Sequence, residues 1–231
     1  MLTRIAPIGT YRVFKPVRDL QQRNLARLNV ARNYGYVHSA AEALQQARFM
    51  TGDIDSIPKK LFPMIATVDA DAPRLAARHF RPDVYLVEIS SRKAFKDASG
   101  WYLQANLLKD KKHDAEVVNI TNRPLKDYMK QITDLLGADR VCFVTHINAV
   151  GTNGETLPFR SSLIEAVTKI AADLDVPVID PTELLESHAQ RNLLDRDGED
   201  LNHYHADATA IIGDFYLQKL KALGWSKATA A

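Results

Sequence analysis

A carboxylate and an imidazole three residues apart are the sharpest candidates for chemistry in this sequence. The stretch DGEDLNHYHADATA places Asp200 and His203 just before the segment that we expect to form the last helix. A carboxylate at this spacing can accept a hydrogen bond from one imidazole nitrogen, which leaves the other nitrogen free as a base. Asp200 and His203 are therefore candidates for an orienting group and a general base. The alternative for the same residues is a capped turn beside a solvated histidine.

A second group of candidate residues follows the first apolar run of the chain. The stretch IAPIGTYRVF ends that run at Gly9 and continues with Thr10, Tyr11 and Arg12. The hydroxyls of Thr10 and Tyr11 are candidates for a nucleophile or a substrate-positioning group. Arg12 is a candidate for holding an anionic group, against the commoner reading of a solvated basic face.

The elements that must position these residues alternate between strand and helix. Near-continuous apolar runs such as DVYLVEIS and RVCFVTHI indicate strands buried on both faces. Amphipathic segments between them indicate helices, including two with capping-box spacing at Ser39/Glu42 and Ser162/Glu165. This alternation predicts a three-layer α/β/α sandwich with a mainly parallel central sheet. The predicted strands cover residues 5–9, 83–90, 140–147 and 176–180, and the clearest helical patterns begin at residues 39, 124, 162 and 207.

One domain over residues 1–231 is the simplest organisation, with residues 20–80 as a helical insertion or flap after the first strand. In an open parallel sheet, ligands bind at the carboxyl ends of the strands. The residues that follow each strand are therefore the candidates for a site. Besides Gly9 to Arg12, they are Ser90, Ser91, His146 and Asn148.

Composition excludes several classes of function. The 231 residues carry a net charge of +2, which gives no electrostatic reason to expect nucleic acid as a partner. No stretch is apolar and long enough to span a bilayer, and a cytoplasmic location is the default expectation. The single Cys142 excludes a multi-cysteine zinc site, and the histidines near His203 and His205 fit no standard metal spacing. We therefore expect no metal and no cofactor.

Taken in order, these segments resemble the SGNH (GDSL-type) hydrolases over most of the chain. That family keeps its catalytic Asp and His as D-x-x-H before the last helix, matching Asp200 and His203. RPDVYLVEISSRK is similar to the middle strand of the family, and VPVIDPTELL to a later one. The overall pattern is closest to the GSCFA-like and capsule-polysaccharide-cluster relatives, which open with Gly-Ser-Cys or Gly-Thr-Cys. The corresponding residues of this chain are Gly9-Thr10-Tyr11.

The resemblance implies a flavodoxin-like fold and an esterase, acyl hydrolase or acyltransferase acting on an acyl group linked to a carbohydrate. It implies His203 as general base oriented by Asp200. Gly35 and either Ser90 or Ser91 fall at positions that face the oxyanion. NYGYVHS also places His38 beside two tyrosines on a turn, where aromatic groups suit a sugar face or a packing cluster.

The nucleophile position of the family falls on Tyr11, and three interpretations remain open. Thr10 supplies the hydroxyl, or Tyr11 positions substrate while His203 activates water or an acceptor hydroxyl, or the site only binds. The last interpretation makes the chain a catalytically silent carbohydrate-binding or assembly protein of polysaccharide biosynthesis. A weaker alternative is a transferase with another donor that uses His146 and Asn148. The expected partner is a small-molecule or saccharide substrate. The sequence does not decide between a monomer and a homo-oligomer.

Overall fold

A five-stranded parallel sheet forms the centre of the protein. The computed structural model describes residues 2–67, 72–108 and 113–225. The strand order is β2-β1-β3-β7-β8, and every pair is parallel. The strands are β1 (Arg4–Ile8), β2 (Arg27–Leu28), β3 (Val84–Glu88), β7 (Val141–Val144) and β8 (Val178–Ile179). Four of these strands match the predicted runs, whereas the two-residue β2 was not predicted.

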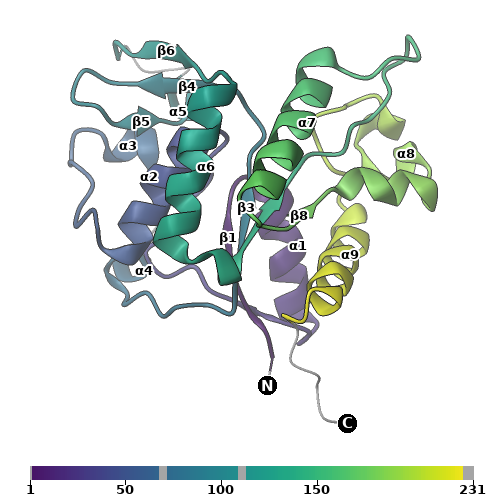
Figure 1. The fold of residues 1–231 in the computed structure, drawn as a ribbon, viewed down its shortest axis with the longest axis horizontal. Coiled ribbons are helices and arrows are strands. Elements are labelled where there is room, and N and C mark those ends of the chain that lie inside the picture. The colour runs from purple at the N-terminus through teal and green to yellow at the C-terminus, as the bar shows by residue number, and fades with distance from the viewer. Residues whose placement is uncertain (1, 68–71, 109–112, 226–231) are drawn as a thin grey trace.

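Helices cover both faces of this sheet (Figure 1). Strand side chains alternate between two apolar cores, so that Val84 and Leu86 lie in one core and Tyr85 and Val87 in the other. The first core includes α1 (Tyr11–Gln22) and α9 (Ala208–Ala222). The second includes α2 (Ala40–Thr51), α6 (Asn122–Leu136) and α7 (Pro158–Asp173). The predicted three-layer sandwich is confirmed.

Local signals account for several helix ends. Ser39 and Glu42 form the predicted reciprocal capping box at the start of α2. Gly137 directly follows α6, as expected for a helix end. The predicted cap at Ser162 is wrong, because α7 already begins at Pro158, and the Ser162 hydroxyl donates within the helix to the carbonyl of Phe159. A proline at the first helical position sets that start.

A small antiparallel sheet that the sequence did not reveal follows β3. Its order is β5-β4-β6, formed by β4 (Lys93–Lys96), β5 (Tyr102–Leu103) and β6 (Glu116–Asn119). These strands are short and mix polar with apolar residues, so they lack the apolar runs that marked the central strands. The remaining short helices are α3 (Phe62–Ile65), α4 (Ala72–Ala76), α5 (Ala105–Leu108), α8 (Gln190–Leu193), η1 (Ala138–Arg140), η2 (Pro181–Glu186) and η3 (Arg196–Gly198). None of the described helices has the length and apolar character needed to cross a membrane.

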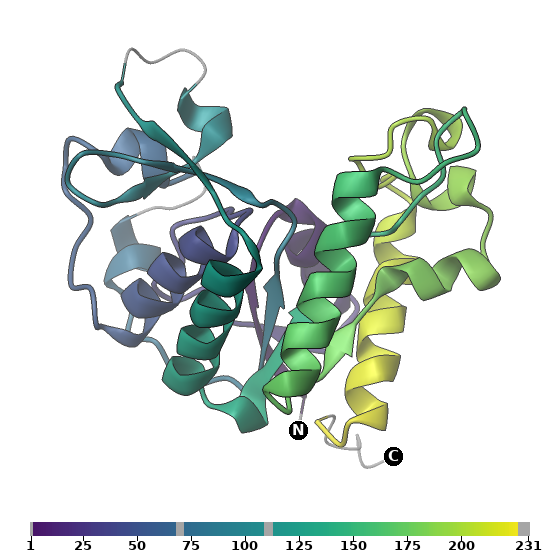
Figure 2. The same ribbon diagram turned by 45° about the horizontal axis from the view of Figure 1, so that its top comes forward.

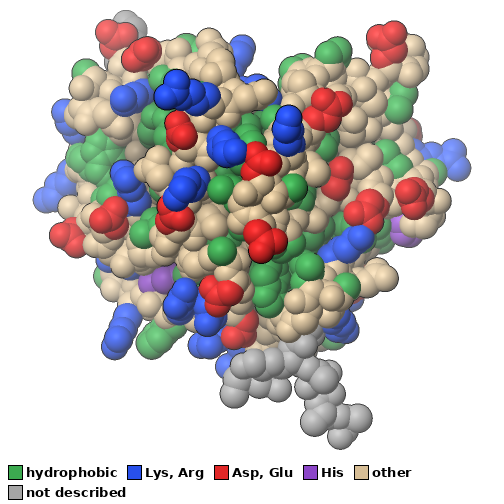
Figure 3. Space-filling view, viewed as in Figure 1, with side chains coloured by type: hydrophobic (Ala, Val, Ile, Leu, Met, Phe, Trp, Pro, Cys, Tyr) green, Lys and Arg blue, Asp and Glu red, His purple; other side chains and the backbone are tan. Residues whose placement is uncertain are grey.

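The chain changes face between β1 and β3. The helix after β1 packs on one face of the sheet, and the helix before β3 packs on the other. The crevice of such a sheet lies at this point, outside the carboxyl ends of the strands. Figure 2 brings this edge forward and shows the start of α1 between the half with the small sheet and the half with α7 and α9. In Figure 3 the surface is hollowed along the upper edge between these two halves.

Candidate active site

The structure joins Asp200 and His203 in a hydrogen-bonded pair. His203 Nδ1 lies 2.9 Å from Asp200 Oδ2, and the imidazole side chain is 58% exposed. Partial burial opposes ionisation of Asp200, but hydrogen bonds from the Asn202 N–H and from His203 outweigh it and lower the pKa of Asp200. The carboxylate therefore stays charged at neutral pH and favours an Nδ1–H imidazole. This geometry leaves Nε2 of His203 free to accept a proton.

Tyr11 lies directly against this pair, although it comes from the other end of the chain. Its ring stacks on the His203 imidazole with 5.9 Å between centroids and 14° between planes. The phenol donates to the carbonyl of Asn202 at 3.1 Å. Burial raises the pKa of Tyr11 and outweighs the lowering by Arg12. Tyr11 is thus a protonated phenol that holds the segment bearing the histidine.

Thr10 is buried and caps α1. Its hydroxyl donates to Glu88 Oε2 at 2.6 Å and accepts from the Arg12 N–H at 3.3 Å. The Thr10 N–H donates to the same carboxylate oxygen at 2.7 Å. Only 1% of the residue is exposed. The hydroxyl of Thr10 is therefore engaged in the interior rather than presented to a ligand.

Arg12 and Glu88 form a buried ion pair beneath this layer. Arg12 Nε lies 2.7 Å from Glu88 Oε1, and NH1 of Arg12 donates to the carbonyl of Asn202 at 3.1 Å. Burial works against the charged guanidinium, but Glu88 outweighs it and raises the pKa of Arg12. The expectation that Arg12 faces substrate does not match these contacts, because its guanidinium binds groups inside the protein.

A second buried arginine approaches the same segment from α7. Arg160 NH1 donates to the Leu201 carbonyl at 2.6 Å, and NH2 donates to Asn202 Oδ1 at 2.8 Å. His146 lies nearby, with Nε2 3.5 Å from the Asn202 carbonyl and Nδ1 2.9 Å from the Ile147 carbonyl. Burial, followed by Arg12 and Arg160, places the pKa of His146 well below its ordinary value. His146 is thus a neutral interior group.

The glycines of the site allow close backbone packing. A Cβ on Gly9 would lie 2.6 Å from Cβ of Glu88, so the end of β1 meets β3 without room for a side chain. Gly35 has φ +125°, and its N–H already donates to Asn33 Oδ1 at 2.8 Å. The expected role of Gly35 as an oxyanion donor conflicts with this contact, because its amide is occupied.

The remaining predicted site residues are Ser90, Ser91, His38 and Asn148. The N–H groups of Ser90 and Ser91 both donate to the His38 carbonyl, at 2.9 and 3.0 Å, so these amides hold the turn before α2. His38 Nδ1 is buried without a hydrogen-bond partner among the described residues, and burial lowers the pKa of this imidazole. Asn148 is held by Thr182 and Ser161 on the far side of β7. His38 therefore lies near the Arg12–Glu88 pair, whereas the partners of Asn148 are Thr182 and Ser161.

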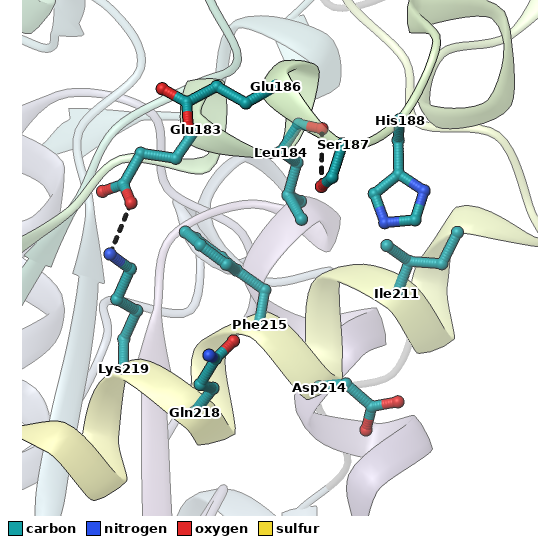
Figure 4. A pocket seen from close by; sticks show the side chains of 10 residues that line it. All are labelled: Glu183, Leu184, Glu186, Ser187, His188, Ile211, Asp214, Phe215, Gln218 and Lys219. Carbon is teal, nitrogen blue, oxygen red and sulfur yellow. Dashed lines mark hydrogen bonds and ion pairs between the residues drawn. The ribbon is translucent and has the colours of Figure 1, made fainter.

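Two further features bear on ligands. Within residues 2–67, 72–108 and 113–225, no group of three or more His, Cys, Asp and Glu side chains is arranged to hold a metal. A cavity of about 480 Å³ lies between η2 and α9, with Glu183, His188 and Lys219 at its border (Figure 4). None of the residues that line this cavity belongs to the layer around His203, so it is separate from the candidate active site.

With this geometry established, the sequence can be compared with known proteins. A family model described as the TviD N-terminal domain matches residues 3–115 and 112–219. The chain belongs to the TviD N-terminal domain family. The Vi polysaccharide biosynthesis protein TviD of Salmonella typhi is 33% identical over 258 residues, an alignment that covers 91% of this chain and 30% of that protein. This member of the family therefore spans less than a third of the length of that relative.

Solved structures share its fold at low sequence identity. A lipase/acylhydrolase from Enterococcus faecalis is 12% identical with a TM-score of 0.54, and the match covers all of both chains. A lipolytic protein of the G-D-S-L family from Desulfitobacterium hafniense is 12% identical with a TM-score of 0.50, over 94% of this chain and 98% of that one. The predicted resemblance to the SGNH/GDSL group is confirmed in the fold, and the predicted relation to capsule-cluster proteins is confirmed by the match to TviD.

Three residues that the sequence analysis missed hold the candidate site together. Glu88 was visible as one carboxylate inside the apolar run DVYLVEIS, and a buried charge of this kind requires a partner. Arg160 and Asn202 gave no comparable signal, because an arginine at a helix start and an asparagine in a turn are both common on surfaces.

Proposed function

We propose that this domain transfers or hydrolyses acyl groups on a carbohydrate during polysaccharide biosynthesis, with His203 as general base and Asp200 as its orienting partner. The observation that carries this proposal is the 2.9 Å Asp200–His203 pair stacked on Tyr11 at the switch point of the sheet. The carbohydrate is suggested by the relative from Salmonella typhi, whose name assigns it to polysaccharide biosynthesis.

The arrangement favours direct attack by a hydroxyl of the acceptor or by water. No serine or cysteine occupies the position of Tyr11, and the Thr10 hydroxyl is buried on Glu88. In the proposed step, Nε2 of His203 removes the proton from the attacking hydroxyl while its oxygen bonds to the acyl carbonyl carbon. The carbonyl oxygen becomes an oxyanion. The oxyanion then re-forms the carbonyl double bond as the leaving group departs with the electrons of its bond to that carbon, and the leaving group takes the proton from His203.

The start of α1 supplies charge complementarity for the oxyanion. The Tyr11 N–H is the first of the helix and has no hydrogen-bond partner among the described residues. Unpaired N–H groups at a helix N-terminus favour negative charge. His38, a neutral imidazole close to Arg12 and Glu88, is the second proposed donor. These two groups replace Gly35, whose amide is occupied.

The proposal is tested with p-nitrophenyl acetate as acyl donor, with and without added saccharide acceptor. His203→Gln and Asp200→Asn are compared with the natural chain, and His205→Gln is the matched control because His205 is half-exposed and outside the pair. Loss of the general base is expected to lower the rate by about 100-fold or more. Turnover that survives His203→Gln unchanged rejects the mechanism.

A second candidate, a domain that binds saccharide without catalysis, is favoured by Tyr11 itself. The phenol of Tyr11, which is hydrogen-bonded to the Asn202 carbonyl, occupies the position where this group of hydrolases carries a nucleophile. This candidate predicts saccharide binding together with no turnover of any acyl ester by the natural chain.

A further inference from the structure

Arg160 occupies a place that costs folding free energy. It is 6% exposed and lies in the first turn of α7, two residues after Pro158. A cation in the first turn of a helix opposes the helix dipole. Burial lowers the pKa of Arg160, and the charge of Arg12 lowers it further. Among the described residues no carboxylate pairs with Arg160, so its charge has only neutral oxygen acceptors as partners.

The hydrogen bonds of Arg160 converge on the residues that separate the two members of the pair. Arg160 donates to the Leu201 carbonyl at 2.6 Å and to Asn202 Oδ1 at 2.8 Å, with a longer contact of 3.3 Å to the Ile147 carbonyl. Leu201 and Asn202 are the only residues between Asp200 and His203. Arg12 binds the same segment through the Asn202 carbonyl. A shift of this segment would move the imidazole relative to its carboxylate.

We infer that Arg160 is a positioning residue, which holds residues 200–203 so that His203 Nδ1 faces Asp200 and Nε2 stays available as the base. It acts through the segment and touches no reacting atom. Three unfavourable terms act on its charge, namely desolvation, the helix dipole and repulsion by Arg12. An arginine placed under such conditions is expected to serve the site rather than stability.

A positioning role and a purely structural role for Arg160 predict opposite changes in the melting temperature when Arg160 is replaced. In Arg160→Met the three unfavourable terms disappear, and water can reach the half-exposed Leu201 and the exposed Asn202 that lose their donor. The buried Ile147 carbonyl keeps His146 Nδ1 at 2.9 Å as a partner. The melting temperature is therefore expected to stay the same or rise. The position of His203 is expected to loosen at the same time. An arginine that mainly supports the fold would instead lower the melting temperature when replaced.

The tautomer of His203 reports the effect without any need for turnover. In the natural chain, nitrogen-15 NMR of the neutral form of the imidazole is expected to show the Nδ1–H tautomer, because Asp200 accepts from Nδ1. Arg160→Met is expected to shift His203 toward the Nε2–H form that predominates in free histidine. Asn202→Ala, which removes one acceptor of Arg160, is expected to act in the same direction. Arg140→Met is the control, since Arg140 donates to the Pro82 carbonyl away from this segment.

Kinetics supply a second readout that rests on the proposed function. Misplacing a base by a fraction of an ångström is expected to lower kcat of Arg160→Met by about 10- to 100-fold with KM unchanged. An unchanged His203 tautomer in Arg160→Met overturns the inference, and so does a variant that unfolds or melts at lower temperature. If the natural chain turns over no ester but the tautomer shifts as described, the proposed function fails while the positioning role stands.

Discussion

The imidazole of His203 rests on the phenol ring of Tyr11, with 14° between the two planes. One residue opens α1 near the start of the chain, and the other precedes α9 near its end. The ring of Tyr11 thus faces the candidate base, while its hydroxyl points to the Asn202 carbonyl. The stacking of the Tyr11 ring and the hydrogen bond of its hydroxyl are therefore two separate roles, and substitutions can test each one.

Tyr11→Phe is expected to retain activity within a few-fold of the natural chain. The substitution keeps the aromatic face beneath His203 and removes only the hydrogen bond to Asn202, which is worth about 1 kcal/mol. The measurement is kcat and KM on the acyl ester used above. A loss of several hundred-fold in Tyr11→Phe would instead identify the phenol oxygen as the nucleophile.

Tyr11→Ala is expected to reduce kcat by about tenfold or more, since the base loses the surface that fixes its orientation. The same kinetic assay checks this expectation, and Tyr36→Ala serves as the comparison because it removes a ring that meets Tyr11 edge-on and leaves the Tyr11 ring in place. Equal rates for Tyr11→Ala and Tyr11→Phe would show that the stacking has no effect on the base.

Thr10→Val is expected to lower the free energy of unfolding by about 1–2 kcal/mol, because α1 loses its capping hydroxyl. Activity per folded molecule is expected to persist, since the hydroxyl binds Glu88 in the interior. Urea unfolding followed by circular dichroism measures the stability change, with Thr10→Ser as the variant that keeps the cap. Loss of turnover in a folded Thr10→Val protein would restore Thr10 as a nucleophile.

Glu88→Gln is expected to lower the free energy of unfolding by about 3–5 kcal/mol, because it leaves the buried guanidinium of Arg12 without its counter-charge. Asp134→Asn breaks the exposed pair between Lys130 and Asp134, and this control is expected to cost about 0.5 kcal/mol or less. Chemical denaturation of both variants gives the comparison. Similar losses for the two would mean that the buried pair contributes no more than a surface one.

Glu42 is expected to make stability fall as pH rises between about 4.5 and 7. Burial raises the pKa of this carboxyl from 4.5 to about 7, while its hydrogen bonds from Ser39 and His38 work in the opposite direction. In this interval the folded chain keeps a proton that the unfolded chain has lost. The contribution of Glu42 to the free energy of unfolding therefore declines as pH rises toward the pKa of the folded state. Glu42→Gln is expected to flatten the curve. Unfolding midpoints at pH 5 and 8 test this, and parallel pH profiles for the two proteins would exclude Glu42 as the cause.

The central fold was predictable because four of its five strands lie within apolar runs of the sequence and several of its helices carry local end signals. DVYLVEIS and the Ser39–Glu42 capping box each specify structure from a few adjacent residues. The small sheet was not predictable for the opposite reason. Its strands have two to four residues, and the pairing of Lys93 with Asn119 depends on contacts 26 positions apart in the sequence. Local patterns contain no information of that kind.

The candidate site shows the same limit in its side chains. The spacing of Asp200 and His203 was sufficient to predict their hydrogen bond, because three residues of turn bring the groups together. It could not reveal that Arg12 turns inward to Glu88, since that depends on the parallel pairing of β1 with β3. Nor could it show that the Gly35 amide is taken by Asn33.

The close approach of α1 and α9 has a consequence for how the site assembles during synthesis. A Cβ on Gly213 would lie 3.0 Å from the Pro16 carbonyl, so this glycine lets the first and last of the long helices meet backbone to backbone. Elongation delivers the chain from its N-terminus, and contacts of such large sequence separation form late. Tyr11 therefore leaves the ribosome long before its partner His203. A nascent chain holds half of the candidate site until nearly the whole domain has been translated.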